Sequence, residues 1–243
     1  MSGIKQIVKT KYSKIAAASR KSCGCSCENK KTISREIGYT AEQLQHVGEA
    51  DMGLGCGNPT AFSRINPGDT VVDLGSGGGI DCFLASKKTG PTGKVVGIDF
   101  TEEMIVKAKA NALKGGYGNV EFKFGDIEAL PLPDNFADII ISNCVINLAP
   151  GKLKVFREAY RVLKPGGKMY VSDIVLLAEL TPEQRSNEEL IAGCVGGALL
   201  KNVYIDVVKQ AGFKVNVLSE NKDISKQQYR GVPLESLMIE VWK

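Results

Sequence analysis

The 243-residue sequence has little histidine, no long apolar run and only a small excess of positive charge. Its single histidine, His46, leaves few candidates for a general base near neutral pH. No apolar run can span a bilayer, and the basic first residues lack the apolar stretch of a signal peptide, so we expect a cytoplasmic protein without a membrane partner. The net charge of +4 is not gathered in a stripe with aromatic residues, which argues against nucleic acid as a partner.

Cysteine, by contrast, is well represented. Seven cysteines in an intracellular chain of this length do not fit a disulfide scaffold and favour metal, metalloid or redox chemistry. Three of them, Cys23, Cys25 and Cys27, cluster near the N-terminus, and the other four are spread over the rest of the chain. Their placement therefore decides between these chemistries.

The chain divides by composition into an N-terminal arm and one domain. Residues 1–37 are rich in lysine and arginine and poor in large apolar residues, so we expect an arm without its own core, which can be mobile. Residues 38–243 have the length of one large domain. It opens with a short helix after Thr40, where Gln43 completes a capping box.

Apolar runs typical of strands alternate with amphipathic segments typical of helices through the domain. The expected strands are 70–74, 94–99, 120–126, 137–142 and 167–174, and the helices between them are 81–88, 102–114 and 152–164. After a polar insertion at 179–200 come a helix at 202–212 and two closing strands near 213–220 and 236–243. This alternation predicts an α/β fold with a doubly wound, mostly parallel, seven-stranded sheet.

A glycine-rich turn, DLGSGGG at Asp73–Gly79, follows the first strand. A nucleotide cofactor needs such a tight turn at the carboxyl end of a strand, and glycines allow it without steric penalty. The dinucleotide fingerprint requires a glycine three places after Gly77, but Ile80 stands there. The observed D-x-G-x-G-x-G resembles the methyltransferase pattern, which favours S-adenosylmethionine over NAD as the ligand.

The next two strands end in residues that suit the remainder of this donor. Any one of these features alone could belong to an ordinary connection, but their order and their position at strand ends favour one site. The carboxylate of Asp99 can accept both ribose hydroxyls, and the segment around Asp126 suits the adenine edge. The predicted donor residues are Asp73, Gly75, Ser76, Gly77 and Gly79 in the turn, Asp99 at the ribose, Met104 and Ile127 beside adenine, Asp126 at its amino group, and Asn143 beside the methionine part.

The acceptor side of the site carries thiols rather than a base. Methyl transfer from a sulfonium requires mainly that the nucleophile be desolvated and aligned. His46 lies outside the strand-end loops and is interpreted as a surface or packing residue. Cys56 precedes the first strand, Cys144 follows the fourth, and Cys194 lies in the late insertion. Because loops at the carboxyl ends of parallel strands face one crevice, these three soft ligands could converge there.

Packing is the competing interpretation for each of these thiols. Free cysteine is among the most buried residue types and behaves as a small hydrophobe. Cys82, on the first helix of the domain, fits that interpretation.

At these residues the sequence resembles a known family, the arsenite methyltransferases. The resemblance runs from about Gly38 to Phe213 and is carried by GLGCGNP, DLGSGGGIDCF, GIDFTEEM, SNCVINL, EAYRVLKPGG and GCVGGAL. The donor turn and EAYRVLKPGG are shared with methyltransferases in general, whereas SNCVINL and the three cysteines are much narrower. The resemblance implies a Rossmann-like methyltransferase fold and a role in arsenic detoxification. It also implies a thiol reductant of thioredoxin or glutathione type as co-substrate.

Carried over position by position, the resemblance implies that Cys56, Cys144 and Cys194 bind trivalent arsenic as thiolates. The lone pair of arsenic would then be free to attack the donor methyl. Soft thiolates suit a soft centre. The sequence departs from the family where Gly193 replaces an expected acidic residue, and longer members carry a further C-terminal domain.

The N-terminal thiols Cys23, Cys25 and Cys27 occur as CGCSC, where the family has single cysteines. Their spacing is tighter than the C-x₂₋₄-C of structural zinc sites. They could pass metalloid to the three site cysteines or exchange a disulfide with Cys56. A zinc site and a passive solvated arm stay open as alternatives.

The sequence thus predicts an enzyme that transfers methyl groups from S-adenosylmethionine to thiol-bound arsenite. One alternative is a methyltransferase for a quinone or another small organic molecule, with the cysteines as packing residues. The other is a thiol-rich metalloid-binding or sensing protein with a vestigial donor pocket. The number of methyl groups transferred and the oligomeric state are left open.

Overall fold

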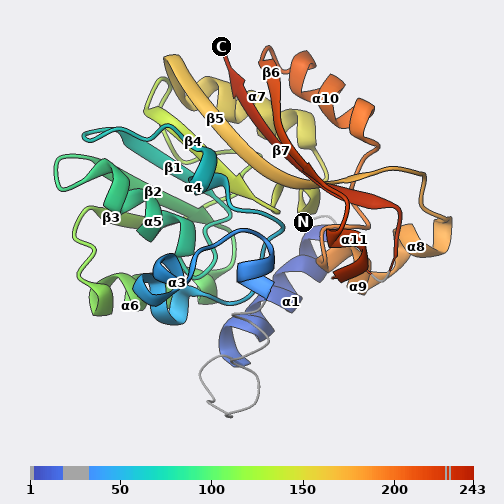
Figure 1. The fold of residues 1–243 in the computed structure, drawn as a ribbon, viewed down its shortest axis with the longest axis horizontal. Helices are drawn as coiled ribbons and strands as arrows, with labels where there is room; N and C mark the ends of the chain where they lie inside the picture. The colour runs from blue at the N-terminus through green and yellow to red at the C-terminus, as the bar shows by residue number, and fades with distance from the viewer. Residues whose placement is uncertain (1–2, 19–32, 228, 230) are drawn as a thin grey trace.

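A computed structural model describes residues 3–18, 33–227, 229 and 231–243, and its strands form one seven-stranded sheet (Figure 1). The strands are β1 (Thr70–Leu74), β2 (Lys94–Asp99), β3 (Val120–Phe124), β4 (Ala137–Asn143), β5 (Leu163–Leu176), β6 (Lys214–Asn221) and β7 (Leu234–Trp242). The order is β3-β2-β1-β4-β5-β7-β6, with β7 antiparallel to both of its neighbours and the other pairs parallel. The predicted fold is confirmed.

Helices cover both faces of this sheet. They are α1 (Gly3–Ala18), α3 (Ala41–Val47), α4 (Pro59–Phe62), α5 (Ile80–Thr89), α6 (Glu102–Gly115), α7 (Lys152–Val162), α8 (Pro182–Ser186), α9 (Glu188–Ala192), α10 (Lys201–Gln210) and α11 (Ile224–Gln227), with short 3₁₀ turns η1 (Gly48–Ala50) and η2 (Ile146–Leu148). Strand side chains alternate between the faces, so Val71 packs with α5 and α6 while Val72 packs with α7 and α10. The central strands are buried on both faces, as expected for a parallel sheet, whereas the edge strands β3 and β6 are mostly exposed or half-buried.

The sheet reverses its winding between β1 and β4. From β1 the chain builds outward to β2 and β3, and then returns to place β4 on the other side of β1. In open α/β sheets, ligands bind at such a switch point, beside the carboxyl ends of the strands. The loops after β1 and β4 therefore define where the site lies.

Strand β5 is longer than predicted. It begins at Leu163, which pairs with Ala137 before an irregularity in the register, and α7 accordingly ends at Val162 rather than continuing to residue 164. Its far end reaches Leu176 and carries Ser172 and Asp173 to the edge of the sheet where the switch point opens.

For residues 3–18, helix α1 corrects the expectation that the N-terminal segment can be mobile. Residues 3–18 form one helix that contacts α6 and α9 (Figure 1), and Val8 is fully buried in the core. Val8, Tyr12 and Ile15 recur at helical spacing, but the intervening lysines obscure this stripe in the composition. Cys23, Cys25 and Cys27 lie outside the described residues, and residue 37 as a domain boundary stays a prediction. No described helix is long and apolar enough to cross a bilayer.

Candidate active site

The glycine turn after β1 is fixed by its backbone. The amides of Gly75 and Ser76 both donate to the carbonyl oxygen of Ile98, at 2.8 and 3.0 Å, which ties the turn to β2. Gly75 has a φ of +72°, and a β-carbon there would clash with the side chain of Val145. Only glycine meets both requirements, so the turn is shaped for close approach of a ligand.

Asp99, at the end of β2, faces the same turn. Its carboxylate accepts the amide of Gly77 at 3.0 Å through Oδ2 and the amide of Thr101 at 2.8 Å through Oδ1. Burial raises its pKa, and these hydrogen bonds act in the opposite direction. Because a carboxylate offers about four lone-pair positions, acceptor capacity remains for ribose hydroxyls.

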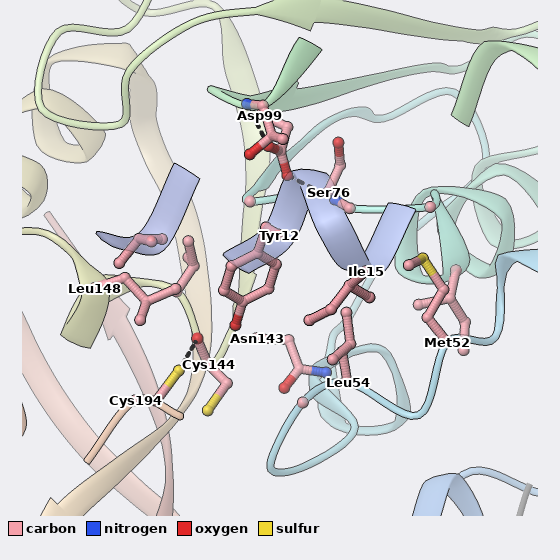
Figure 2. A pocket seen from close by; sticks show the side chains of 18 of the residues that line it. Tyr12, Ile15, Met52, Leu54, Ser76, Asp99, Asn143, Cys144, Leu148 and Cys194 are labelled. Atoms are coloured by element: carbon pink, nitrogen blue, oxygen red, sulfur yellow. Dashed lines mark hydrogen bonds between the residues drawn. The ribbon is translucent and has the colours of Figure 1, made fainter. Parts of the chain in front are cut away.

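A cavity of about 340 Å³ opens at this edge of the sheet, within the size range of ligand pockets (Figure 2). Eight predicted site residues line it: Asp73, Gly75, Ser76, Gly77, Asp99, Asn143, Cys144 and Cys194. Ser76 offers a further polar group, because its buried Oγ has no hydrogen-bond partner among the described residues. A hydroxyl that is free in this position fits a polar ligand atom.

The remaining predicted donor residues lie around this cavity. Asp126 and Ile127 line a smaller hollow that shares Gly75 and Asp99 with it. Gly79 is the N-cap of α5, with a left-handed backbone. Met104 is fully buried in a cluster with Ala16 and Met52. Neither Gly79 nor Met104 lines the two hollows, so their predicted contacts with the donor stay predictions.

Asp126 is held by the N-terminal helix. The ammonium of Lys5, on α1, lies 2.5 Å from a carboxylate oxygen of Asp126 and 2.5 Å from one of Glu128. The predicted contact of Asp126 with an adenine amino group would thus share the carboxylate with Lys5. Sequence analysis gave no reason to connect Lys5 with this residue.

Two buried carboxylates stand beneath the glycine turn. Burial raises the pKa of Asp73 well above its usual value, and the charge of Asp81 raises it further. Burial raises the pKa of Asp81 to about 6, against hydrogen bonds from Tyr39 and Asn143 that lower it. A cationic ligand would favour the ionised forms, because an opposite charge stabilises a carboxylate.

Asn143 connects the donor turn to the first thiol loop. Its Nδ2 donates to the Tyr39 hydroxyl at 2.9 Å, to the Gly57 carbonyl at 2.8 Å and to Asp81 Oδ2 at 3.2 Å. Its Oδ1 accepts the amide of Cys56 at 3.2 Å. The amide therefore binds both the loop of Cys56 and the acidic wall of the cavity.

The loops that carry the three predicted thiols meet beside this cavity. The sulfurs of Cys56 and Cys144 and a carboxylate oxygen of Asp173 all lie within 4.8 Å of one another. Cys194 Sγ donates to the carbonyl of Cys144 at 2.6 Å. Cys144 and Cys194 line the cavity, whereas Cys56 lies behind them, only 2% exposed. The three loops therefore lie next to one another, but the close cluster consists of Cys56, Cys144 and Asp173 and does not include Cys194, so the three thiols as one arsenic site stay a prediction.

The carbonyl of Ser172 on β5 holds two of these loops. It accepts the amide of Cys144 at 2.8 Å and the thiol of Cys56 at 3.5 Å. The Cys56 carbonyl in turn accepts the hydroxyl of Ser236 at 2.6 Å. A β-carbon on Gly57 would clash with the Ser172 side chain. The strands thus position Cys56 through its backbone.

Cys144 and Cys194 have strained backbones. Their φ angles are +56° and +66°, and the only other described non-glycine residue with a positive φ is Asn135. Side chains rarely adopt this region, and such conformations persist where surrounding contacts impose them, often at functional sites. Two of three instances fall on the cavity thiols, which favours a functional role over packing.

Cys144 and Cys194 are held in the protonated form. Hydrogen bonds with the thiols of Cys194 and Cys56 raise the pKa of Cys144, and burial adds to them. For Cys194 the hydrogen bond with Cys144 lowers the pKa and is the largest single effect, but burial together with the charges of Asp173 and Cys56 makes the net shift upward. Neutral thiols are weak nucleophiles until a partner takes the proton.

Several neighbours of the thiols escaped the sequence analysis. Asp173 accepts the Tyr204 hydroxyl at 3.0 Å and Asn147 Nδ2 at 2.9 Å, and burial raises its pKa to about 7. Its place at the end of a predicted strand was a signal that could have been used. Tyr12 and Tyr229 also line the cavity, and only the helical spacing of Tyr12 hinted at its burial.

His46 and Cys82, which the sequence analysis interpreted as surface or packing residues, do not line the cavity. His46 lies on α3 with 48% of its side chain exposed and does not line the cavity. Cys82 is fully buried and donates to Asp73 Oδ2 at 3.2 Å. Both locations agree with the interpretations drawn from the sequence.

Comparison with known proteins gives the family. Residues 65–227 match the family described as "Methyltransferase domain". An arsenite methyltransferase from Halobacterium salinarum is 42% identical over 223 residues, which are 86% of this chain and 57% of that protein. A demethylmenaquinone methyltransferase from Lactococcus lactis is 38% identical over 102 residues, 42% of this chain and 40% of that protein.

A solved structure extends the likeness to three dimensions. The crystal structure of an arsenic(III) S-adenosylmethionine methyltransferase from Chlamydomonas reinhardtii has 33% sequence identity and a TM-score of 0.68, covering 87% of this chain and 73% of that one. The chain spans about half the length of the curated arsenite methyltransferases that it matches. By the match to the methyltransferase domain and the identity to these relatives, the chain belongs to the arsenite methyltransferase family.

Proposed function

We propose that this protein transfers methyl groups from S-adenosylmethionine to trivalent arsenic bound by Cys56, Cys144 and Cys194. One observation carries the proposal: Cys144 and Cys194 line the same cavity as the glycine turn. The proposed role is arsenic detoxification in the cytoplasm. A thiol reductant of thioredoxin or glutathione type would serve as co-substrate.

Loading of arsenite is an exchange of oxygen for sulfur. Each thiol forms an As–S bond as one As–OH bond breaks, and the thiol proton leaves with the hydroxide as water. Three such exchanges place arsenic on three sulfurs without any change of oxidation state. The upward pKa shifts of Cys144 and Cys194 suit this step, because the protonated thiol supplies the proton that the leaving hydroxide needs.

The transfer step needs alignment rather than a base. S-adenosylmethionine supplies an electrophilic methyl group on a positively charged sulfur. The arsenic lone pair forms the As–C bond while the methyl–sulfur bond breaks, and that electron pair stays on the donor sulfur. Arsenic carries no proton to remove, which agrees with the exposed position of His46. Arsenic is formally oxidised by two electrons, and the thiol reductant would return them before the next transfer.

The chain's own residues hold the two partners in line. Asp99 would accept the ribose hydroxyls, Asn143 would lie beside the methionine part, and the glycine turn would admit the donor to close contact. Ser76 offers its unpartnered hydroxyl in the same wall. The roles of Met104, Ile127 and Asp126 at adenine complete the proposal. Enclosure under α1 would exclude water from the reacting atoms.

The cluster of Cys23, Cys25 and Cys27 is proposed as a relay for metalloid or for disulfide exchange. Replacing the three residues by serine should slow multiple turnover under a physiological reductant. Unchanged multiple-turnover rates would contradict this role.

The decisive test is incubation with arsenite, labelled donor and a thiol, followed by separation of the arsenic species. We expect methylated arsenic from the wild type and a loss of at least about 100-fold in Cys144→Ser and Cys194→Ser, since removing a group on which the reaction depends has effects of this size. Cys82→Ser is the matched control, because that thiol is buried outside the cavity. Retained activity in both site variants would refute the mechanism.

The two alternatives give different results in the same experiments. The partial likeness to the Lactococcus lactis protein supports a quinone-type methyltransferase. Such an enzyme would methylate an organic acceptor equally well without Cys144. A metalloid sensor would bind arsenite but give no heat of S-adenosylmethionine binding in calorimetry.

A further inference from the structure

Two tyrosines from opposite ends of the chain reach the thiol side of the cavity. Tyr12 lies on α1, and Tyr229 follows α11. Both line the cavity together with Cys144 and Cys194. Neither belongs to the glycine turn or to the thiol set, so the proposed function leaves them without a role.

Tyr12 is anchored in the cavity at both ends of its side chain. Its hydroxyl donates to the carbonyl of Ala192 at 3.3 Å, two residues before Cys194. Its helix is fixed by the buried Val8 and by the ion pairs of Lys5. Figure 2 shows the ring inside the pocket, between Asp99 on one side and the two thiols on the other. The ring therefore occupies space next to the proposed arsenic position.

Tyr229 approaches the same thiols from the C-terminal part of the chain. Burial raises its pKa well above the usual value, and the charges of Cys144, Cys56 and Cys194 raise it further, in that order. Tyr229 lines the cavity beside Cys144 and Cys194. Tyr12 has the same pattern, with burial first and then the charges of Cys194 and Cys144. Both side chains are neutral phenols that add bulk to the cavity without adding charge.

We propose that Tyr12 and Tyr229 are specificity-determining residues that limit the size of the organic group on a thiol-bound arsenical. The inference rests on the proposed function, since it assumes arsenic at the thiols. When arsenic carries one organic group, that group takes the place of one of the three thiolates on arsenic. The organic group must then lie in the cavity. A methyl group needs little room, whereas an aryl group competes with the phenol rings. Aromatic side chains make stiff walls because they have few rotatable bonds.

The test compares arsenite with phenylarsonous acid in the purified full chain, with S-adenosylmethionine and a thiol present. The quantity of interest is the ratio of kcat/KM for phenylarsonous acid to that for arsenite. Tyr12→Ala should raise this ratio at least about tenfold, mainly through a lower KM for the aryl substrate, since pocket size typically discriminates by about 10- to 200-fold per group. Tyr12→Phe retains the ring and should leave the ratio within about twofold of the wild type.

Ile15→Ala is the matched control. Ile15 lies on the same helix and lines the same cavity, but its side chain lies toward Leu54, away from the two thiols (Figure 2). Its truncation should leave the ratio unchanged. Tyr229→Ala approaches the site from the other end of the chain, so it should raise the ratio even if the α1 variant fails to fold, as judged by circular dichroism.

An unchanged ratio in folded Tyr12→Ala and Tyr229→Ala, with arsenite methylation intact, overturns the inference and leaves the proposed function standing. A raised ratio in Tyr12→Phe equal to that in Tyr12→Ala also overturns it, since the hydroxyl rather than the bulk would then decide. Failure of the function itself is recognised separately, by methylation that persists without Cys144 and Cys194.

Discussion

The donor half and the thiol half of the site are built in different ways. The donor half is centred on one short turn, Asp73–Gly79, whose shape follows from glycine backbones and a tie to β2. The thiol half comes from three loops far apart in the chain, held by Asn143 and by the carbonyl of Ser172. The first is specified locally and the second by tertiary contacts, so substitutions in the two should fail in different ways.

Gly75→Ala should show the largest effect and confine it to the donor half. A β-carbon would clash with Val145 at a φ of +72°, which L residues disfavour. We expect S-adenosylmethionine affinity to fall at least about 100-fold, or about 3 kcal/mol, in calorimetry. Arsenite binding, followed by equilibrium dialysis, should stay within about twofold.

Gly77→Ala is the control for this change, because no atom stands within 4 Å of its added β-carbon. An equal loss in both variants would show that backbone strain alone, and not the contact with Val145, shapes the turn.

Asn143→Ala should affect the donor half and the thiol half together. The side chain bonds Cys56 and Gly57 on the thiol side and Tyr39 and Asp81 on the donor side. Leaving such partners unsatisfied costs about 1–3 kcal/mol each in the worst case, so we expect the free energy of unfolding to drop by about 2–3 kcal/mol. Binding of both donor and arsenite should weaken. The control is Asn66→Ala, whose side-chain bonds to Arg64 and Asp69 are local and exposed. Loss of affinity for only one ligand in Asn143→Ala would place Asn143 in one half alone.

Asp81→Asn should alter the pH dependence of stability through the donor half. The folded pKa of Asp81 is about 6, above the usual value, so the folded state binds the proton more tightly than the unfolded state. The free energy of unfolding of the wild type should therefore fall as pH rises from about 4 to about 6, by about 2 kcal/mol from this group. The variant should lose this component in urea titrations at pH 4.5 and 7, and an identical slope in both proteins would contradict the assignment.

Lys5→Ala should have the smallest effect. Its ion pairs with Asp126 and Glu128 are partly exposed, and such pairs contribute about 0.5–1 kcal/mol. We expect amide hydrogens of α1 to exchange about two- to fivefold faster by mass spectrometry. Lys9→Ala, which removes a longer contact of 3.8 Å with Glu102, should change the exchange less. Equal exchange in both variants would show that Val8 and Tyr12 alone hold the helix.

The two halves also differ in how well the sequence predicts them. The glycine turn, Asp99 and the order of the strands follow from periodicity and from the rule that strand ends meet at one edge, and the structure brings them together. Cys144 was placed by the same rule. That Cys194 reaches Cys144 depends on the path of residues 177–200, which has no regular period.

Other features could not be predicted because their signal is not local. Helix α1 lies within a lysine-rich segment, so its apolar stripe of Val8, Tyr12 and Ile15 is diluted in composition and becomes meaningful only on the folded domain. The second role of Asn143, as the link to Cys56, depends on a loop nearly ninety residues earlier in the chain. Asp173 was read as the end of a strand and not as a neighbour of thiols.

Helix α1 is also a single rigid element that spans the whole site. Its sixteen residues measure about 24 Å, with Lys5 paired to Asp126 and Tyr12 bound to the carbonyl of Ala192, two residues before Cys194. A movement of the helix that separates Lys5 from Asp126 would also disturb the contact of Tyr12 with Ala192. If donor and arsenic bind as proposed, the same helix would cover both ligands, and binding of either one would change the affinity for the other by the same factor.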